Sequence, residues 1–259
     1  MERITAPAND KIKYAVRLAA QPAFRRAQRA FFLEGARLCA DAAASGLPLL
    51  QVFLTAAAAE KYAAYLAPVL AEAAQVYEIG DAPARKLSDT EHPQGVFCIC
   101  GFPEDDAAVP APQGRYLALE QVQDPANLGA ISRSAEALGL DGLFVSGGCD
   151  RWNPKALRAS MGALLRLPIL ETDDLPALLR KAAADGMQTL AAVPDPAAAD
   201  IRTVPHPGGV ICCIGNEGGG LTDAVQAACA VRAVIPMRGR AESFNAAAAA
   251  AILAWELQR

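Results

Sequence analysis

The chain has 259 residues, a formal net charge of −4, and 53% apolar and 20% charged residues, which suits a globular protein of one or two domains. The net charge excludes an indiscriminately basic nucleic-acid binder. The longest apolar block near the C-terminus has about ten residues, half of what a membrane-spanning helix needs. The first ten residues are polar, so we expect no secretory signal and a cytoplasmic protein.

The seven cysteines include no C-x-x-C pair, and there are only two histidines. Most of the cysteines lie in apolar runs, where a thiol behaves as a small hydrophobic group. The composition therefore predicts buried free thiols rather than disulfides or a metal site.

The first hundred residues predict a small α/β domain. Residues 11–46 are expected to be helical, because Phe31, Phe32 and Leu38 recur at helical spacing and Gly46 is a natural stop. The other expected elements are a strand at 49–54, a helix at 56–74, a short apolar run at 76–79, a short helix at 85–89 and a strand at 95–100. Prolines and glycines then predict a linker at 103–114, which separates a domain at 1–102 from one at 115–259.

Regular alternation of strands and helices begins at Arg115. The expected strands are 116–122, 142–145, 167–170, 187–193, 210–214 and 231–235. The expected helices are 128–138, 155–165, 175–184, 221–229 and 244–257. This alternation predicts a mainly parallel sheet with helices on both of its faces.

Two groups of basic residues stand out on this acidic chain, one within residues 11–37 and one within residues 151–166. Such local patches suit a selective contact with a polyanion, although solvated helix faces explain either patch equally well. The residues expected to contact such a polyanion are Lys11, Lys13, Arg25, Arg26, Arg29, Lys155 and Arg158.

Polar clusters follow three strands of the second domain. In the first, Q-D-P-A-N-L-G-A-I-S-R at 123–133, Asn127 is placed to cap a helix and Arg133 follows six residues later. The spacing alone favours a plain cap and a surface cation. In the second, G-N-E-G-G-G at 215–220, the glycines suit a nucleotide-like ligand or a tight turn, and Glu217 could accept hydrogen bonds.

The third cluster, I-P-M-R-G-R-A-E-S-F-N at 235–245, connects an apolar strand to an alanine-rich helix. Ser243 or Asn245 is expected to cap that helix. Loops at the carboxyl ends of parallel strands are where open α/β sheets bind ligands. A further segment at 153–163, N-P-K-A-L-R-A-S-M-G-A, carries Lys155 and Arg158 on one helix face.

Taken in order, these four segments resemble the motifs of the SpoU (TrmH-like) branch of the SPOUT RNA methyltransferases, over residues 115–259. More loosely, R-R-A-Q-R-A-F-F-L-E-G-A-R-L and L-S-D-T-E-H-P-Q-G-V resemble the small ribosomal-protein-like RNA-binding domain often fused to that branch. The resemblance implies a C-terminal α/β domain threaded into a trefoil knot, a homodimer, and 2′-O-methylation of RNA ribose with S-adenosylmethionine.

The resemblance also assigns roles to residues. It places the cofactor against Gly215, Glu217, Gly218, Ile235, Met237, Phe244 and Asn245. It makes Arg133, Asn127, Ser243 and Asn245 catalytic. A guanidinium is a poor base at neutral pH, so we expect Arg133 to clamp the target phosphate and stabilise negative charge, with proton acceptance as the alternative.

Two residues depart from the family pattern: Phe244 stands where Leu is usual, and His92 where Thr is common. Ribosomal RNA of the large subunit is the expected substrate, by analogy with the appended N-terminal domain. The alternatives are methylation of transfer RNA, or a non-catalytic RNA-binding or ribosome-assembly factor with the same fold. A nicotinamide-dependent enzyme is disfavoured, because the early glycine-rich fingerprint is missing.

Overall fold

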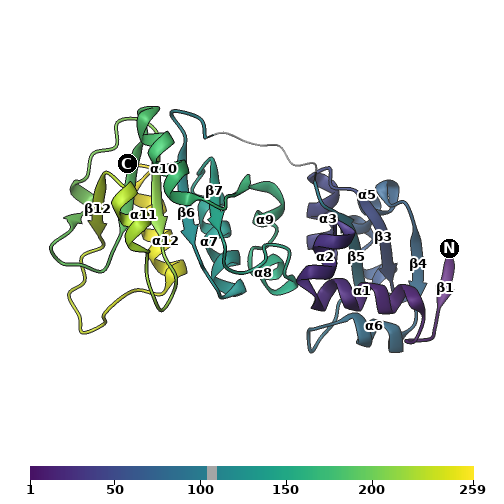
Figure 1. The fold of residues 1–259 in the computed structure, drawn as a ribbon. Helices are drawn as coiled ribbons and strands as arrows, with labels where there is room; N and C mark the ends of the chain where they lie inside the picture. The colour runs from purple at the N-terminus through teal and green to yellow at the C-terminus, as the bar shows by residue number, and fades with distance from the viewer. Residues whose placement is uncertain (104–109) are drawn as a thin grey trace. The chain divides into compact units, whose positions relative to one another are not determined.

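A computed structural model describes residues 1–103 and 110–259, so most of the predicted linker, residues 104–109, lies outside the described residues. The chain forms two compact units (Figure 1). The first contains residues 1–103 and 152–165, and the second contains residues 110–151 and 166–259. The predicted domain boundary put residues 152–165 in the C-terminal domain, whereas their contacts group them with the first unit.

The first unit is built on a five-stranded mixed sheet in the order β1-β4-β3-β5-β2. Its strands are β1 (Glu2–Ile4), β2 (Ala30–Glu34), β3 (Leu49–Leu54), β4 (Val76–Ile79) and β5 (Val96–Gly101). Its helices are α1 (Asp10–Ala20), α2 (Pro22–Gln28), α3 (Ala36–Ala44), α4 (Ala56–Lys61), α5 (Ala63–Glu72), α6 (Asp81–Leu87) and α8 (Pro154–Ala159). The aromatic core beneath α1 includes Phe32, Phe53 and Phe97.

The predicted helix over residues 11–46 is wrong, because this stretch contains a strand and three helices. Phe31 and Phe32 lie in β2, whose five residues are all buried. A short strand covered on both faces is apolar at every position, so it lacks the alternation that would distinguish it from part of a helix. Pro22 starts α2 at its first turn, where proline is well tolerated.

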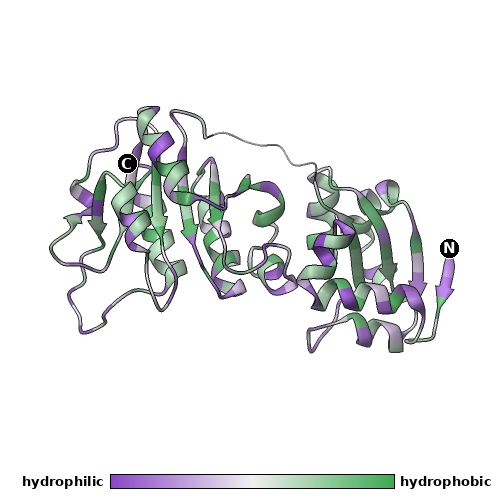
Figure 2. Ribbon diagram, in the orientation of Figure 1, coloured by the Kyte–Doolittle hydropathy of each residue, from purple (hydrophilic) through white to green (hydrophobic). Residues whose placement is uncertain are grey.

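The second unit is built on a seven-stranded sheet in the order β10-β12-β9-β11-β6-β7-β8, and every pairing in it is parallel. Its strands are β6 (Arg115–Glu120), β7 (Gly142–Ser146), β8 (Ile169–Glu171), β9 (Gln188–Ala192), β10 (Ala199–Asp200), β11 (Val210–Ile214) and β12 (Val231–Val234). The predicted parallel sheet is confirmed. Figure 2 shows its central strands as strongly hydrophobic, as expected for strands covered on both faces.

Four helices accompany this sheet: α7 (Pro125–Ala137), α10 (Leu175–Ala184), α11 (Asp223–Ala228) and α12 (Ala246–Glu256). The short helix α9 (Ala163–Arg166) begins in the first unit and ends where the second unit resumes. Helices α10 and α11 pack over a core that includes Tyr116, Phe144 and Ile211. Helices α7 and α12 pack against each other, and α12 contacts β11. The trefoil knot stays a prediction.

The predicted helix at 155–165 is broken into α8 and α9. Met161 and Gly162, which lie between them, both adopt positive φ angles, of 50° and 88°. In the described part of the chain, no helix is long and apolar enough to cross a membrane.

Candidate active site

The three polar clusters of the second unit meet at one edge of its sheet. Strands β12, β9, β11 and β6 are neighbours and run parallel. The loops at 121–124, 215–222 and 235–245 leave the carboxyl ends of β6, β11 and β12. They therefore surround one region, the position that ligands occupy in open parallel sheets.

A hydrogen-bond network joins these loops around Glu217. Its carboxylate accepts hydrogen bonds from the backbone N–H groups of Gln123 at 3.0 Å and Asp124 at 3.1 Å. The same carboxylate accepts from the side-chain amide of Asn127 at 2.9 Å. Asn127 in turn accepts from the side-chain amide of Asn245 at 3.0 Å. The network thus contains one residue from each cluster, and Asn127 is hydrogen-bonded to both of the others.

The network also sets the starts of two helices. Asp124 caps α7 by accepting from the Ala126 N–H at 2.9 Å. Asn245 caps α12 by accepting from the N–H groups of Ala247 and Ala248, which confirms Asn245 as one of the two predicted caps. Each helix presents free N–H groups and a positive dipole end at its start, so the Glu217 carboxylate lies where negative charge is stabilised.

The glycine loop after β11 is folded back on itself. The side-chain oxygen of Asn216 accepts from the N–H groups of Gly218 at 2.8 Å and Gly219 at 2.9 Å. Asn216 and Gly220 also pair through their backbones. A Cβ atom on Gly215 would lie 2.1 Å from the Gly220 carbonyl carbon. Only glycine therefore fits at position 215, where two backbone segments touch.

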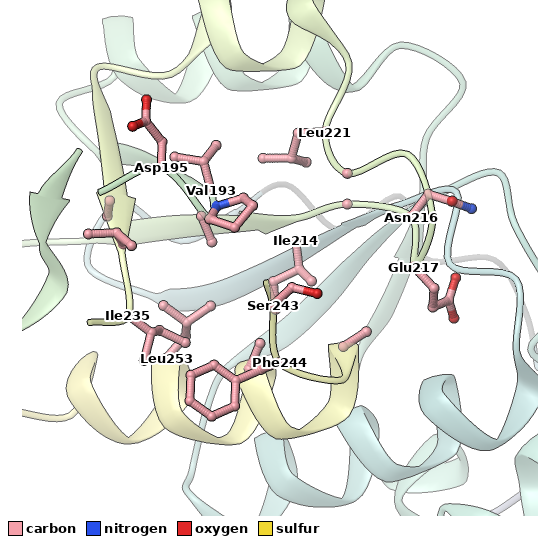
Figure 3. Close-up of a pocket in the computed structure, with 18 of the residues that line it drawn as sticks. Val193, Asp195, Ile214, Asn216, Glu217, Leu221, Ile235, Ser243, Phe244 and Leu253 are labelled. Atoms are coloured by element: carbon pink, nitrogen blue, oxygen red, sulfur yellow. The ribbon is translucent and has the colours of Figure 1, made fainter. Parts of the chain in front are cut away.

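A cavity of about 590 Å³ opens between the loops at 215–222 and 235–245, within the size range of small-molecule sites. Its apolar walls come from residues such as Ile214, Ile235 and Leu253. Figure 3 shows Glu217 and Asn216 at one end of the cavity, with Asp195 and Ile235 at the other. The cavity can therefore hold a flat apolar group between its walls, with polar groups at both ends.

The electrostatics of the network favour a charged Glu217. Partial burial alone would raise the pKa of its carboxyl, but hydrogen bonds from Asn127 and from the backbone outweigh burial, and the pKa is lowered from 4.5. Cys149 lies nearby, and burial raises the pKa of its thiol to about 11, assisted by the negative charges of Glu217, Asp150 and Asp124. This thiol is protonated at neutral pH and cannot serve as a base there.

The predicted cofactor residues all line this cavity: Gly215, Glu217, Gly218, Ile235, Met237, Phe244 and Asn245. Ser243 lines it as well. Asn127 does not line the cavity but is hydrogen-bonded to two residues that do, Glu217 and Asn245. Arg133 does not line it. Its side chain is exposed on α7, where it is accessible to a large substrate. The roles of these residues stay predictions.

Sequence reasoning missed the contribution of β9. Val193 and Asp195 follow that strand and line the cavity, together with Arg232 of β12. Asp195 and Arg232 form an ion pair at 2.9 Å. The signal that would have found them is strand order, because β9 lies between β11 and β12, so that its carboxyl end must enter the same site.

The predicted RNA-contacting residues of the first unit differ in their surroundings. Arg25 is only 1% exposed, and its guanidinium donates to the Ala19 carbonyl at 2.9 Å. Its assignment as an RNA contact is wrong, because a buried cation that satisfies helix carbonyls is a structural residue. Arg26, Arg29 and Lys155 are exposed.

The remaining three cations of that set form ion pairs. Lys11 pairs with Glu2 and Lys13 with Asp10. Arg158 pairs with Asp89 at 2.7 Å, and one of its nitrogens lies 3.6 Å from Glu34. Ion pairs between exposed side chains, such as the first two, contribute little stability, so both lysines remain available to bind a polyanion.

Comparison with known proteins identifies the family. The model of the SpoU rRNA Methylase family matches residues 114–255. The chain belongs to this family. The model of the MRM3-like substrate binding domain matches residues 9–98, upstream of the SpoU region.

Relatives resemble the chain over most of its length. A relative from Synechocystis, named as an uncharacterised tRNA/rRNA methyltransferase, is 31% identical over 99% of this chain and 93% of its own length. The 23S rRNA (guanosine(2553)-2′-O)-methyltransferase RlmP of Bacillus subtilis is 31% identical over 71% of this chain and 73% of its own. The crystal structure of an AdoMet-bound rRNA methyltransferase from Sinorhizobium meliloti superposes with a TM-score of 0.85 at 30% identity, covering 98% and 96% of the two chains.

The cavity fits S-adenosylmethionine, the cofactor of SpoU enzymes. Its apolar walls suit a flat adenine ring, and the glycine loop brings backbone within reach of a ligand, since a Cβ at Gly215 has no room. The carboxylate of Glu217, with its lowered pKa, supplies negative charge that attracts a sulfonium. In the described residues, no group of three or more His, Cys, Asp or Glu side chains is arranged to hold a metal ion.

Proposed function

We propose that this chain methylates the 2′-hydroxyl of a ribose in large-subunit ribosomal RNA, with S-adenosylmethionine as the methyl donor. The observation that carries the proposal is the network of Glu217, Asn127 and Asn245, which joins three motif loops beside a cavity whose size and polarity suit the donor. Membership of the SpoU rRNA methylase family and the ribosomal RNA names of its relatives support this substrate class.

The donor supplies a methyl group that is already activated, so the residues of the chain have to position and activate the ribose hydroxyl. That hydroxyl is a weak nucleophile until its proton is drawn away and the forming alkoxide is stabilised. Arg133 is exposed on α7, the helix whose start is fixed by Asn127 and Glu217. We assign to Arg133 the clamping of the target phosphate and the stabilisation of developing negative charge.

Asn127 and Asn245 act as positioning residues in this scheme. Both side-chain amides are engaged, Asn127 with Glu217 and Asn245 with Asn127, and they hold the start of α7 against the start of α12, which lines the cavity. Ser243 lies on the same wall, where its hydroxyl can donate to the ribose. A protonated Cys149 cannot take the proton of the hydroxyl.

The first unit is proposed to hold the RNA. Its match to a substrate binding domain supports this role, as do the exposed side chains of Arg26 and Arg29. Contacts of this kind release counterions, so RNA affinity should fall as salt rises, with a shallow slope because the phosphate contacts are few. An affinity that does not depend on salt would contradict this role.

We also propose a homodimer that forms through α12 and α7. Helix α12 is apolar around its whole circumference, yet Trp255 on it is 60% exposed and Phe244, just before it, is 42% exposed. A helix that is hydrophobic all round is expected to be covered on all sides. Sedimentation of the wild type should give a dimer, and Trp255→Asp should give a monomer. A monomeric wild type would contradict the proposal.

The proposed activity is tested with radiolabelled methyl transfer to ribosomal RNA from a strain that lacks the gene. We expect label in large-subunit RNA, and mapping of 2′-O-methyl groups should give one position that is absent in the mutant strain. Transfer RNA serves as the matched control and should stay unlabelled. Label in transfer RNA alone, or S-adenosylmethionine binding without any transfer, would overturn the assignment.

A further inference from the structure

Three motif segments that take no part in the cofactor cavity meet in the first unit. The end of β2 supplies Glu34 and Gly35, the loop at 88–95 follows α6, and residues 152–165 contain α8 and the turn after it. They are far apart in sequence, and they enclose a second cavity of about 290 Å³.

A buried carboxylate fixes these segments in place. The Glu34 side chain is 4% exposed and accepts hydrogen bonds from the Ser88 hydroxyl at 2.6 Å, the Thr90 hydroxyl at 2.8 Å and the Asp89 N–H at 3.2 Å. Arg158 contributes charge from α8, 3.6 Å from Glu34 and 2.7 Å from Asp89. Buried polar groups satisfied in this way rigidify their surroundings, so the wall of the cavity is preformed.

Gln94 forms a second attachment, at the start of α3. Its side-chain oxygen accepts from the Ala36 N–H at 2.8 Å, and Gly35 beside it has a φ angle of 111°. Within the described residues, the amino group of this side chain has no hydrogen-bond partner. It is exposed, and it belongs to a residue that lines the cavity, so it can donate to a ligand.

Met161 brings an apolar group to the same cavity. It is 45% exposed and adopts a φ angle of 50°, beside Gly162 at 88°. A non-glycine residue with positive φ costs free energy and is often found at functional positions. A thioether is flexible and polarisable, which suits it to packing against the face of a flat ligand.

The charges in this cavity balance, which argues for a neutral ligand. Among the lining residues, Arg37 and Arg158 bring two positive charges, and Glu34 and Asp41 bring two negative ones. Asp89, outside the lining, adds a further negative charge beside Arg158. A free phosphate would meet both carboxylates. A flat neutral group that has donors and acceptors on its edge fits better. RNA exposes such groups where bases are unstacked, and proteins read those bases by stacking and edge hydrogen bonds.

We propose that this cavity binds one unstacked nucleobase of the RNA substrate. Met161 packs on the face of the base, and Arg37 and the amino group of Gln94 donate to its edge. The inference rests on the proposed RNA methyltransferase activity and deepens it, because it gives the first unit a means of reading the RNA sequence in addition to phosphate contacts.

The test compares Met161→Ala and Arg37→Ala with Tyr65→Ala. Tyr65 is 48% exposed in the same unit but does not line the cavity. With transcribed large-subunit ribosomal RNA, each of the first two variants should raise KM and the RNA Kd by about tenfold, the loss of one modest contact. Turnover, S-adenosylmethionine affinity and the unfolding midpoint should stay at wild-type values, which separates recognition from folding.

A direct readout is ultraviolet cross-linking of the wild type to the same RNA. The tryptic peptide at 159–166, which contains Met161, should carry a cross-linked nucleotide. Wild-type RNA affinity in both variants, or cross-links only in other peptides, would overturn the proposal. RNA binding that depends on Met161 without methyl transfer by the wild type would instead overturn the proposed activity and leave the base site standing.

Discussion

Replacement of Asn127 by Asp tests the network with almost no change in shape. Asn127 is 8% exposed, and its amide nitrogen lies 2.9 Å from a Glu217 oxygen. In Asn127→Asp, an oxygen takes the place of that donor, and two carboxylates face each other. The helix dipole alone predicts the opposite outcome, because a negative charge in the first turn of α7 should stabilise the helix by about 0.3–1 kcal/mol. The sign of the effect therefore decides between the two arguments.

The magnitude follows from the contacts. Loss of a hydrogen bond to a charged acceptor costs about 1.5–3 kcal/mol. If the repulsion between the two carboxylates exceeded the cost of protonating one of them, that carboxyl would bind a proton. The repulsion is therefore limited to about 5 kcal/mol at pH 7.5, for a group with a pKa near 3.9. Together, the two effects should lower the free energy of unfolding by roughly 2 to 8 kcal/mol. S-adenosylmethionine affinity should fall by at least about tenfold.

The pH dependence gives the defect a signature. Repulsion raises the pKa of the carboxyl pair in the folded state, so that state binds more protons than the unfolded chain and its stability falls as pH rises. The loss of stability in Asn127→Asp, relative to the wild type, should therefore shrink from pH 8 to pH 5.5. The loss in Asn127→Ala, which adds no charge, should stay constant. Calorimetric titration and thermal unfolding measure both. If Asn127→Asp were as stable as the wild type at pH 8, the reasoning would be refuted.

Four further predictions follow from the same structure. Gly215→Ala should abolish S-adenosylmethionine binding in calorimetry, because its Cβ would lie 2.1 Å from backbone. Gly239→Ala should bind normally, because its Cβ would meet nothing within 4 Å and the residue does not line the cavity. Arg133→Ala should reduce kcat by about 100-fold or more and leave S-adenosylmethionine affinity unchanged, and undiminished turnover would remove it from the mechanism. The pKa of Glu217 is lowered, so the stability that its carboxylate contributes is present above pH 4.5 and is lost as the pH falls further. Below pH 4.5 the unfolding midpoint of the wild type should therefore drop more steeply than that of Glu217→Gln. Trp152→Ala should destabilise the first unit by about 3–5 kcal/mol in denaturant titration, since Trp152 is 6% exposed and stacks on two phenylalanine rings; a loss below about 1 kcal/mol would contradict this.

The site region could be predicted from sequence because local signals and sheet geometry agree there. Strand, loop and helix patterns placed residues 215–220 and 235–245 after parallel strands, and such strands share one ligand-binding edge. Asn245 could be predicted as a cap because its chemistry is local. These two clusters accordingly line one cavity in the structure.

The partnerships within the site could not be predicted in the same way. Glu217 bonds to Asn127 across 90 residues of sequence, and no local pattern encodes such a pair. Asp195 follows a strand with no motif of its own, so only the strand order reveals it. Arg25 lies in a basic stretch that looks uniformly solvated, and its burial depends on how α1 and α2 pack.

The network has a consequence for synthesis of the protein. Asn127, Glu217 and Asn245 are joined across 90 and 118 residues of sequence, so Asn245 leaves the ribosome 118 residues after Asn127. Domains fold from the N-terminus during translation. Contacts between residues far apart in sequence cost loop-closure entropy before they contribute any stability. A nascent chain therefore cannot complete its cofactor cavity until Asn245 and α12 have been synthesised, and a product truncated before α12 should be unable to bind S-adenosylmethionine.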